Sequence, residues 1–567
     1  MRPWYQRAGA MAGGAMPGSA TERAFTANFT WYMFFSCVVA ASGGALFGWD
    51  NGVTGGVVSM KGFLEQFFPE TIGKEATSSG DLYCTYNNQK IQWFTSSLFL
   101  AGAATEISGT TAYLNRKAGR KFTMAAAGVM FEIGGIILAA AMNYEMLIIG
   151  RCFLGVAISF ASVSVPMYNS EMAPPQLRGR LNQLFQIILT FAIFAAQMIN
   201  IGTSKLYPWG WRLSLGLCMV PATTLLLGGI FLDDTPNSLC ERGHPEEARR
   251  VLEKIRGTKD VDEEYQDILE KAELAALVKN PWTLLLFRKK YRPQLVCAAC
   301  STLFQQWTGI NTIIFYAPQL FLSLGGNQQD ALIATVIVGL CNHFSTYISF
   351  WLADHFGRRF LFIEAGFQML VALIVIAISL ARMVPAPAWL GWYTLAFILL
   401  FDSAYAWSWG PLGWLYPFEI QPLETRPAGG AVASLMNLLF SFVIGQTYLS
   451  MLCALKWGVF VLFACCVFLM TLSVYLFFPE TKGVPIEDCP YVFKHHWYWK
   501  KFANIEDKDA IQEKILEKKK VADTAENGAA GQHATDTGAK LQQPAENRPT
   551  EGAQDGSIEM SKAAQRK

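Results

Sequence analysis

The stretch FTWYMFFSCVVAASGGALFGWDNGVTGG, Phe29 to Gly56, is an apolar run that reaches a carboxylate, Asp50, among glycines. A helix needs about 20 predominantly apolar residues to cross a bilayer, and the segment from Phe29 to Trp49 has that length. Similar runs recur as far as Phe478, and only 16% of the residues are charged, against roughly 25% in an average soluble domain. The chain is therefore predicted to be an integral membrane protein with many spans.

Twelve apolar runs are long enough to span a membrane. We predict helices for all of them, because backbone groups in lipid must form hydrogen bonds within their own segment. The fold class is therefore an all-α membrane protein with twelve transmembrane helices. Their predicted bounds are 29–49, 91–113, 122–142, 145–167, 180–201, 211–232, 295–323, 328–352, 359–382, 390–417, 428–452 and 456–478.

Charged residues determine the predicted organisation of the chain. Lys and Arg gather in alternate connections, such as NRKAGRK (115–121) and GRR (357–359), so these connections and both termini are predicted to be cytoplasmic. A charged segment divides the spans into two sets of six. The predicted parts are a cytoplasmic leader (1–28), a six-helix half (29–232) with an external lid loop at about 59–90, a cytoplasmic helical linker (233–294), a second six-helix half (295–478) and a largely disordered cytoplasmic tail (479–567).

An internal repeat relates the two halves. GRKFTM (119–124) follows span two and GRRFLF (357–362) follows span eight, while SEMAPPQLRGR (170–180) and FEIQPLETRPAG (418–429) follow spans four and ten. Orientation rules explain the Arg residues in these loops but not the matched acids. The repeat therefore predicts two related halves, with a substrate site between them near the middle of the bilayer.

These motifs together resemble the sugar porter family of the major facilitator superfamily, and most closely the plant and algal monosaccharide/proton symporters. The resemblance extends from about Phe29 to Trp499 and implies the major facilitator fold. Further motifs that carry it are FGWDNGVTGGV (47–57), GRCFLGV (150–156), VPMYNSEMAP (165–174), FQQWTGINTIIFYAP (304–318), AWSWGPLGWLYPFEIQPLETR (406–426) and PETKG (479–483).

Asp50 is the candidate proton site. An acid near the membrane interior is costly unless it is paired or solvated, and Arg151, flanked by apolar sequence in span four, is its expected partner. Pairing favours the charged form of a carboxylate and desolvation favours the neutral form, so a cycle between the two moves protons. The alternative is that Asp50 marks the end of span one and faces external water. The resemblance implies the first reading, with Asp50 as proton carrier and Arg151 as counter-charge.

Uncharged amides inside the spans favour a neutral, hydroxyl-rich ligand, because amides donate and accept hydrogen bonds without charge. Hydrogen bonding between helices is the alternative use for each amide. The resemblance implies that these amides contact a hexose, that Trp414 and Phe47 pack on its apolar face, and that Ser441 stands where close relatives often have Thr. The predicted set is Phe47, Gln186, Gln305, Gln306, Asn311, Asn342, Trp414, Asn437 and Ser441.

Charges in the cytoplasmic connections are predicted to form ion-pair networks that close the inner side of the transporter. A solvated orientation signal is the alternative. Relatives often have an acid where this chain has Asn115, whereas the second half keeps Asp354, so unequal latching of the halves is expected. The predicted gate residues are Arg120, Glu171, Arg178, Arg180, Asp354, Arg358, Arg359, Glu419, Glu424 and Arg426.

Two of the twelve cysteines, Cys84 and Cys453, are predicted to face an oxidising external compartment. The resemblance implies a disulfide between them that tethers a small lid over the proton site to the other half. The six His residues show no ligand spacing, so neither a metal nor a cofactor is expected.

The favoured function is import of a hexose, with glucose as the first candidate, coupled to a proton by alternating access. Passive hexose facilitation and sugar sensing by the same fold are the alternatives. Enzymatic activity is not expected, because no nucleophile-base constellation and no phosphate loop is visible. The expected partners are a monosaccharide, a proton and the lipid bilayer, with no nucleic acid. A multi-pass monomer in the plasma membrane is expected, with vacuolar and plastid membranes as alternatives.

Overall fold

The computed structural model describes residues 30–71, 84, 88–174, 177–276, 281–315, 328–381, 388–422, 425–482, 484 and 492–502. They all belong to the first of two units into which the chain divides, Met1–Asn504 and Ile505–Lys567. The predicted leader, most of the predicted lid loop and the tail after residue 502 lie outside the described residues.

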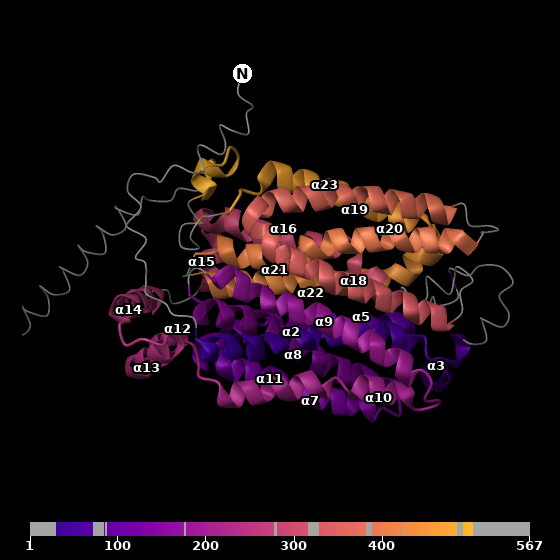
Figure 1. Cartoon of the computed structure of the whole chain (residues 1–567), viewed down its shortest axis with the longest axis horizontal. Helices are drawn as coiled ribbons and strands as arrows, with labels where there is room; N and C mark the ends of the chain where they lie inside the picture. Colours follow the sequence, from indigo (N-terminus) through magenta and orange to yellow (C-terminus); the bar gives the residue numbers. More distant parts are fainter. Residues whose placement is uncertain are drawn as a thin grey trace, which may run out of the picture. The chain divides into compact units, whose positions relative to one another are not determined.

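Each of the twelve predicted spans contains helix among its described residues (Figure 1), and the described residues contain no strand. The predicted class, an all-α membrane protein, is therefore confirmed. In chain order the span helices are α2 (Trp31–Val58), α5 (Gln89–Ile107), α7 (Arg120–Ala139), α8 (Tyr144–Met172), α9 (Arg178–Thr203), α10 (Gly210–Gly216) with α11 (Met219–Phe231), α16 (Arg292–Trp307), α18 (Gln328–Phe356), α19 (Arg358–Ala381), α20 (Ala388–Trp407) with α21 (Trp409–Ile420), α22 (Arg426–Leu455) and α23 (Gly458–Phe477).

Among the described residues, nine spans are long and apolar enough to cross a membrane by length and composition. The other three are α5, which carries several polar residues, and two interrupted helices. α16 ends at Trp307 and helix resumes at residue 310, after Gly309, whose φ of 84° suits glycine. The second break lies at Ser408, whose Oγ accepts from the Trp409 N–H at 2.5 Å and caps α21.

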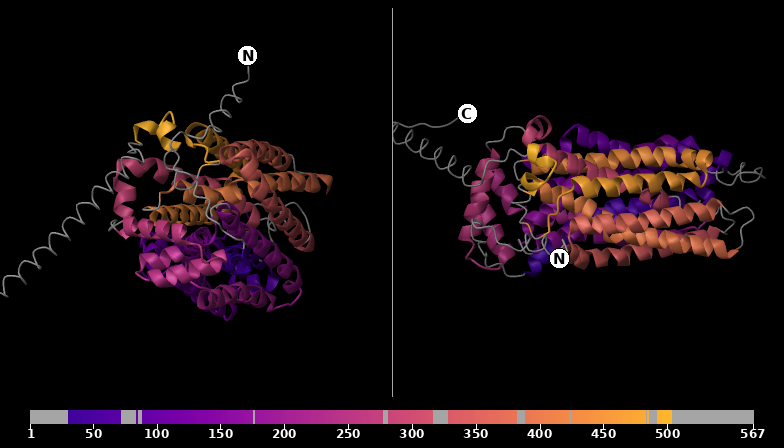
Figure 2. Two further views of the ribbon diagram at one scale, coloured as in Figure 1. Left: turned by 60° about the vertical axis from the view of Figure 1, so that its left-hand side comes forward. Right: turned by 90° about the horizontal axis from the view of Figure 1, so that it is seen from above.

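The span helices form two halves, α2 to α11 and α16 to α23, which take the indigo-to-magenta and the red-to-orange colours in Figures 1 and 2. Inside the halves, α2 packs along α9 and α7 along α8, while α16 packs on α22 and α19 on α23. The halves meet along α5 with α22 and along α9 with α18. The second and fifth spans of one half thus meet the fifth and second spans of the other, as two related halves require.

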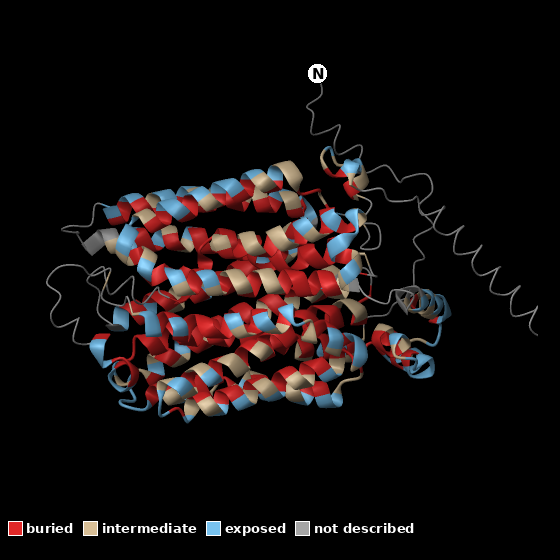
Figure 3. Ribbon diagram, turned by 180° about the vertical axis from the view of Figure 1, so that it is seen from behind, coloured by how far each residue is buried: buried red, intermediate tan, exposed pale blue. Residues whose placement is uncertain are grey.

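Burial follows the pattern expected in lipid (Figure 3). Large apolar side chains face outward, with Phe231 78% and Phe367 60% exposed, whereas Arg151 and Asn437 are 0% exposed. A surface this apolar is a liability in water but matches hydrocarbon. The polar residues therefore lie between the helices, where a transport site has to be built.

Shorter helices lie at the two ends of the spans (Figure 1). α13 buries one face, including Val251 and Ile255, and docks at the start of α2, where the Thr30 hydroxyl donates to the Ile255 carbonyl at 2.7 Å. Lys254 binds Asp233 at 2.7 Å, and this hydrogen bond raises the pKa of Lys254 above its ordinary value.

We call the end of the spans at which α13 lies the linker end. The opposite end, where Cys84 and Cys453 lie, is called the disulfide end. The short elements are α3 (Lys61–Phe67), α6 (Thr110–Lys117), α12 (Pro236–Glu241), α13 (Pro245–Arg256), α14 (Asp262–Ala276), α15 (Pro281–Phe287), η2 (Lys289–Tyr291), η3 (Phe493–His495) and η4 (Trp499–Lys501).

A row of glycines lets α2 approach α9 closely. Gly44, Gly48 and Gly52 lie one turn apart, and a Cβ at Gly48 would run into the carbonyl oxygen of Leu189. This packing explains why α2 stays helical to Val58, nine residues past the predicted end of span one at residue 49. The glycines that lower the apolar character of the sequence are the residues that hold the helix against its neighbour.

Gly48→Ala is therefore expected to separate α2 from α9 and to cost about 1–3 kcal/mol of stability, the usual penalty for overpacking. The matched control is Gly202→Ala on α9, where a Cβ meets nothing within 4 Å. The thermal midpoints of the two purified variants in detergent test this expectation. A Gly48→Ala protein as stable as the Gly202→Ala protein would contradict it.

Candidate functional site

The two ionisable residues predicted to pair are brought together inside the N-terminal half. Asp50 on α2 and Arg151 on α8 are 2% and 0% exposed, and Arg151 Nη1 donates to Asp50 Oδ1. Arg151 Nη2 donates to the Thr54 hydroxyl at 2.8 Å. Asp50 therefore lies within a helix and is buried, so the alternative that it faces external water at a helix end is wrong.

Aromatic rings cover this ion pair. The Arg151 guanidinium lies 4.1 Å from the ring centroid of Phe94 on α5, and the Phe63 ring of α3 lies 5.2 Å beyond Phe94. Phe63 also packs on Trp211 at 5.5 Å. Sequence reasoning missed Thr54, Phe94 and Phe63 because rings in an apolar chain carry no signal of their own. The short helix α3 thus closes over the pair from the disulfide end.

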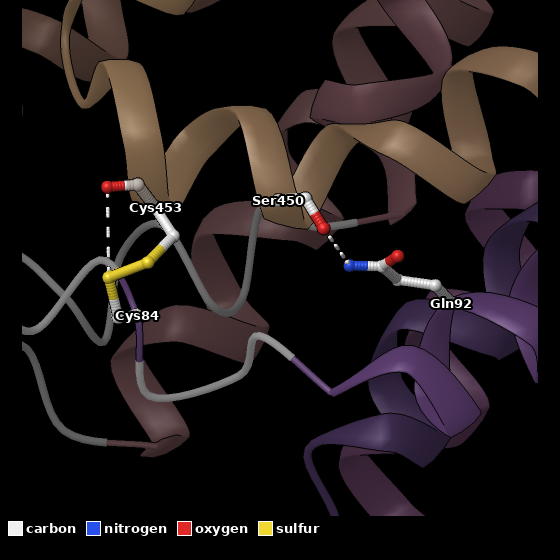
Figure 4. Close-up of a disulfide and its surroundings, with 4 residues drawn as sticks. All are labelled: Cys84, Gln92, Ser450 and Cys453. Carbon is white, nitrogen blue, oxygen red and sulfur yellow. Dashed lines mark hydrogen bonds between the residues drawn. A yellow bond between two sulfur atoms is a disulfide. The ribbon is translucent and has the colours of Figure 1, made fainter.

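A disulfide joins Cys84 to Cys453, as the resemblance implied, with a Cα–Cα distance of 4.6 Å (Figure 4). It connects the loop before α5 to the end of α22, across 369 residues. Beside it, Gln92 Nε2 donates to the Ser450 hydroxyl at 2.9 Å, so α5 and α22 are also joined directly. A cavity of about 720 Å³ lies here, lined by Gln89, Gln92, Gln446, Thr447, Ser450, Met451, Ala454 and Leu455.

Removing this disulfide with Cys84→Ser and Cys453→Ser is expected to lower the free energy of unfolding by about 2–5 kcal/mol. The reason is that the unfolded chain has more conformational entropy without the cross-link than with it. The thermal midpoint of the purified double variant should fall, and the native protein should fall to the same value under reducing conditions. Cys240→Ser, at a free cysteine on α12, is the control. An unchanged midpoint on reduction would contradict the expectation.

Five of the predicted sugar contacts lie in the C-terminal half and form two hydrogen-bonded sets, which together we call the amide cluster. Gln305 Nε2 donates to the carbonyls of Trp409 and Gly410 at 2.9 and 2.8 Å, and its Oε1 accepts from Asn437 at 2.7 Å. A second set joins Gln306 to Asn311 at 2.5 Å and Asn311 to Ser441 at 3.3 Å. The breaks after α16 and α20 place these groups together, so backbone polar atoms freed at the breaks find side-chain partners.

Gln186 and Trp414 lie across the seam between the halves. They line a cavity of about 10 Å³ together with Pro411 and Phe185, whose ring lies 6.0 Å from that of Trp414. This volume is near the minimum for a single water molecule, so a larger molecule can enter only if the halves separate here. Phe47, the remaining predicted ring, packs on Phe99 at 6.2 Å, and Phe99 in turn packs on Phe315 at 5.9 Å.

Asn342 lies apart from the cluster of five and has a carboxylate partner that sequence reasoning missed. Its Nδ2 donates to Asp402 Oδ1 on α20 at 2.6 Å, and Asp402 is 0% exposed. Glu106 on α5 is equally buried and accepts from the Ser159 hydroxyl at 2.8 Å. Both acids stand in apolar runs, so the signal that identified Asp50 was present for them too.

Two of the predicted gate residues, Arg120 and Arg358, form ion pairs with acids of their own half or of the linker. Arg120 binds Glu171 at 2.9 Å and Glu241 on α12 at 2.7 Å, and Arg358 binds Glu419 at 3.0 Å. Arg180 lies 5.7 Å from the Phe350 ring, while Arg359 and Arg426 donate to the carbonyls of Tyr475 and Gln421. Glu424 and the side chains of Arg178 and Asp354 lie outside the described residues.

The two gate clusters are built alike. Thr235 donates to Glu171 after α11, and Thr481 donates to Glu419 at 3.0 Å after α23. Arg120 and Arg358 each also donate to the carbonyl five residues earlier, at Asn115 and Ala353. Sequence reasoning missed these threonines, although LDDTP (232–236) and FPETK (478–482) stand at matched positions. The unequal latching expected from Asn115 stays a prediction.

The sequence contains a CxxC spacing, Cys297 to Cys300. Both residues lie on α16 and are free thiols, and Cys297 is buried against the Phe477 carbonyl at 3.9 Å. Within the described ranges no group of three or more His, Cys, Asp or Glu residues could hold a metal ion. These thiols are packing residues of the seventh span.

Two six-helix halves, a buried ion pair in one of them and an amide cluster in the other define a multi-pass membrane transporter. Residues 36–493 match the family model described as "Sugar (and other) transporter", and the chain belongs to this family. The predicted resemblance is therefore confirmed.

Among the relatives, Sugar transport protein MST3 of Oryza sativa subsp. japonica is 47% identical over 506 residues, 88% of this chain and 97% of that protein. Sugar transport protein 10 of Arabidopsis thaliana is 47% identical over 502 residues, with 87% and 97% covered. A structure of the proton:xylose symporter XylE of E. coli, bound to 6-bromo-6-deoxy-D-glucose, matches with a TM-score of 0.70 at 26% identity, covering 81% of this chain and 99% of that one. The matched proteins are transporters and not enzymes, as predicted.

Proposed function

We propose that the protein imports a hexose, glucose first, together with a proton by alternating access. The observation that carries this proposal is the combination of two sites. The buried Asp50–Arg151 pair lies in the N-terminal half, and an uncharged amide cluster centred on Gln305 lies in the C-terminal half. The names of the relatives support sugar as cargo, and the proton:xylose symporter among the structural matches supports proton coupling. Amides suit a neutral polyol, whereas an anion would need cationic partners.

Protonation of Asp50 removes the charge that holds Arg151. The guanidinium keeps Thr54 and Phe94, but the direct link between α2 and α8 weakens. Because an ion pair that loses one charge leaves the other charge buried without compensation, the two protonation states favour different packing of these helices. Proton binding therefore biases the equilibrium between the two arrangements of the halves.

A continuous set of contacts connects the proton pair with the sugar cluster. Phe315 and Asn311 lie on one helical segment, and a Cβ at Gly55, on the helix that carries Asp50, would meet the Phe315 carbonyl. Phe99 touches both Phe315 and Phe47. Movement of α2 is thus transmitted to the segment that holds Asn311, which couples proton and sugar.

We propose that the linker end and both termini face the cytoplasm, which the positive connections support, and that the membrane is the plasma membrane. The Arg120–Glu171 and Arg358–Glu419 pairs then lie at the inner ends of the helices, and each pair holds helices of one half together. The narrow space beside Trp414 and the wide cavity at the disulfide end favour entry of sugar from outside. A monomer suffices for this cycle, because both halves of the site are in one chain.

The decisive experiment measures uptake of labelled glucose into liposomes containing the purified protein, with and without an inward proton gradient. The expected result is accumulation above equilibrium only with the gradient. Equilibration regardless of the gradient would instead establish a passive facilitator. Glucose binding without any uptake would favour a sensor. Competition by unlabelled hexoses and pentoses then ranks the cargo.

A further inference from the structure

We propose that Asp402 is a positioning residue that decides which end of the Asn342 amide meets the sugar. The inference rests on the proposed function, in which Asn342 is a sugar contact. Asp402 lies on α20 and Asn342 on α18, both inside the C-terminal half, and Asn342 Nδ2 donates to Asp402 Oδ1 at 2.6 Å. Neither side chain is more than 4% exposed.

The chemistry of the pair determines the orientation of the amide. An asparagine carries an acceptor oxygen at one end and a donor NH₂ at the other, whereas an ionised carboxylate only accepts. Asp402 therefore binds the NH₂ of Asn342 and leaves its oxygen for another partner. A sugar hydroxyl that meets Asn342 must then donate its hydrogen. Without the carboxylate the amide is free to turn, and the sugar meets either end.

The surroundings of Asp402 connect it to the amide cluster. Tyr405, one turn further along α20 on the same face, contacts the Gln305 side chain. On α18, a Cβ at Gly339, one turn before Asn342, would meet the Gln197 amide on α9, so this face of α18 lies at the seam between the halves. Asp402 Oδ2 has no hydrogen-bond partner in the described part of the chain. Among the described residues, the side chain of Asp402 therefore accepts a hydrogen bond only from Asn342.

Fluorinated sugars test this orientation, because a C–F group cannot donate a hydrogen bond. Binding of glucose and of its 2-, 3-, 4- and 6-deoxyfluoro analogues to the purified protein gives four ratios of dissociation constants. In the native protein, at least one position is expected to show a tenfold or larger penalty for fluorine. In Asp402→Asn, whose side chain can either donate or accept, that penalty is expected to fall to threefold or less.

Two further variants separate positioning from a structural role. The exchange variant Asp402→Asn with Asn342→Asp returns an acceptor to the sugar and is expected to restore the penalty, and it serves also if the single variant does not fold. Glu364→Gln, at another membrane acid that binds Gln368 and Trp407, is the matched control and should leave all four ratios unchanged.

Outcomes against the inference differ from failure of the proposed function. Ratios that stay the same in Asp402→Asn, in a protein that binds glucose, would overturn the role of Asp402 alone. A penalty lost in Asp402→Asn but not restored in the exchange variant would also overturn it. A folded native protein that binds no hexose would overturn the proposed function and this inference with it.

Discussion

Asp50→Asn is expected to abolish gradient-driven accumulation of hexose while sugar still crosses the membrane down its own gradient. One pH unit corresponds to about 1.4 kcal/mol, so each coupled proton supports roughly tenfold accumulation at that gradient. The variant carries no exchangeable proton at this site, and its accumulation ratio should fall to one. The amide also preserves the size of the side chain beside Arg151, so the protein should fold.

The control for Asp50→Asn is Glu132→Gln, another acid in a span, which binds Thr223 on the neighbouring helix. It should accumulate sugar as the native protein does. Paired measurements of sugar and proton uptake in the same liposomes are the readout. Native-like accumulation by Asp50→Asn would show that the coupling proton binds elsewhere, with Glu106 and Asp402 as the first acids to examine.

The ion pair could be predicted from sequence because an ionisable residue in an apolar run has few acceptable environments. The aromatic rings that cover the ion pair could not be predicted in this way. Phe94 and Phe63 come from a span and a short helix far from Arg151 in sequence, and only packing brings them over the guanidinium. The disulfide between Cys84 and Cys453 was likewise implied by resemblance, since spacing alone does not identify the partner of a cysteine.

The predicted sugar contacts show the same division. The cap at Ser408 could not be predicted, because a serine in a polar-aromatic sequence has many uses. Asn342 was found, and its carboxylate partner was not. An amide in a span is recognised by its chemistry, whereas its orientation depends on a neighbour from another helix.

Gln305→Ala is expected to weaken sugar binding tenfold to a hundredfold. Gln305 is hydrogen-bonded to Asn437 and to two carbonyls at the start of α21, and its loss leaves these groups without that partner. Each unsatisfied buried group costs about 1–3 kcal/mol. The control is Gln294→Ala, a buried amide three turns earlier on the same helix, α16, which should keep native affinity.

The Gln305→Ala and Asp50→Asn variants together test whether cargo and coupling reside in different halves. Gln305→Ala should raise the KM for glucose and still accumulate it at saturating sugar, because the proton pair is intact. Asp50→Asn should bind glucose with near-native affinity and accumulate none. If instead both variants lost binding and coupling equally, the two sites would act as one unit, and Phe99 and Phe315, which contact each other beside Phe47, would also belong to the binding site.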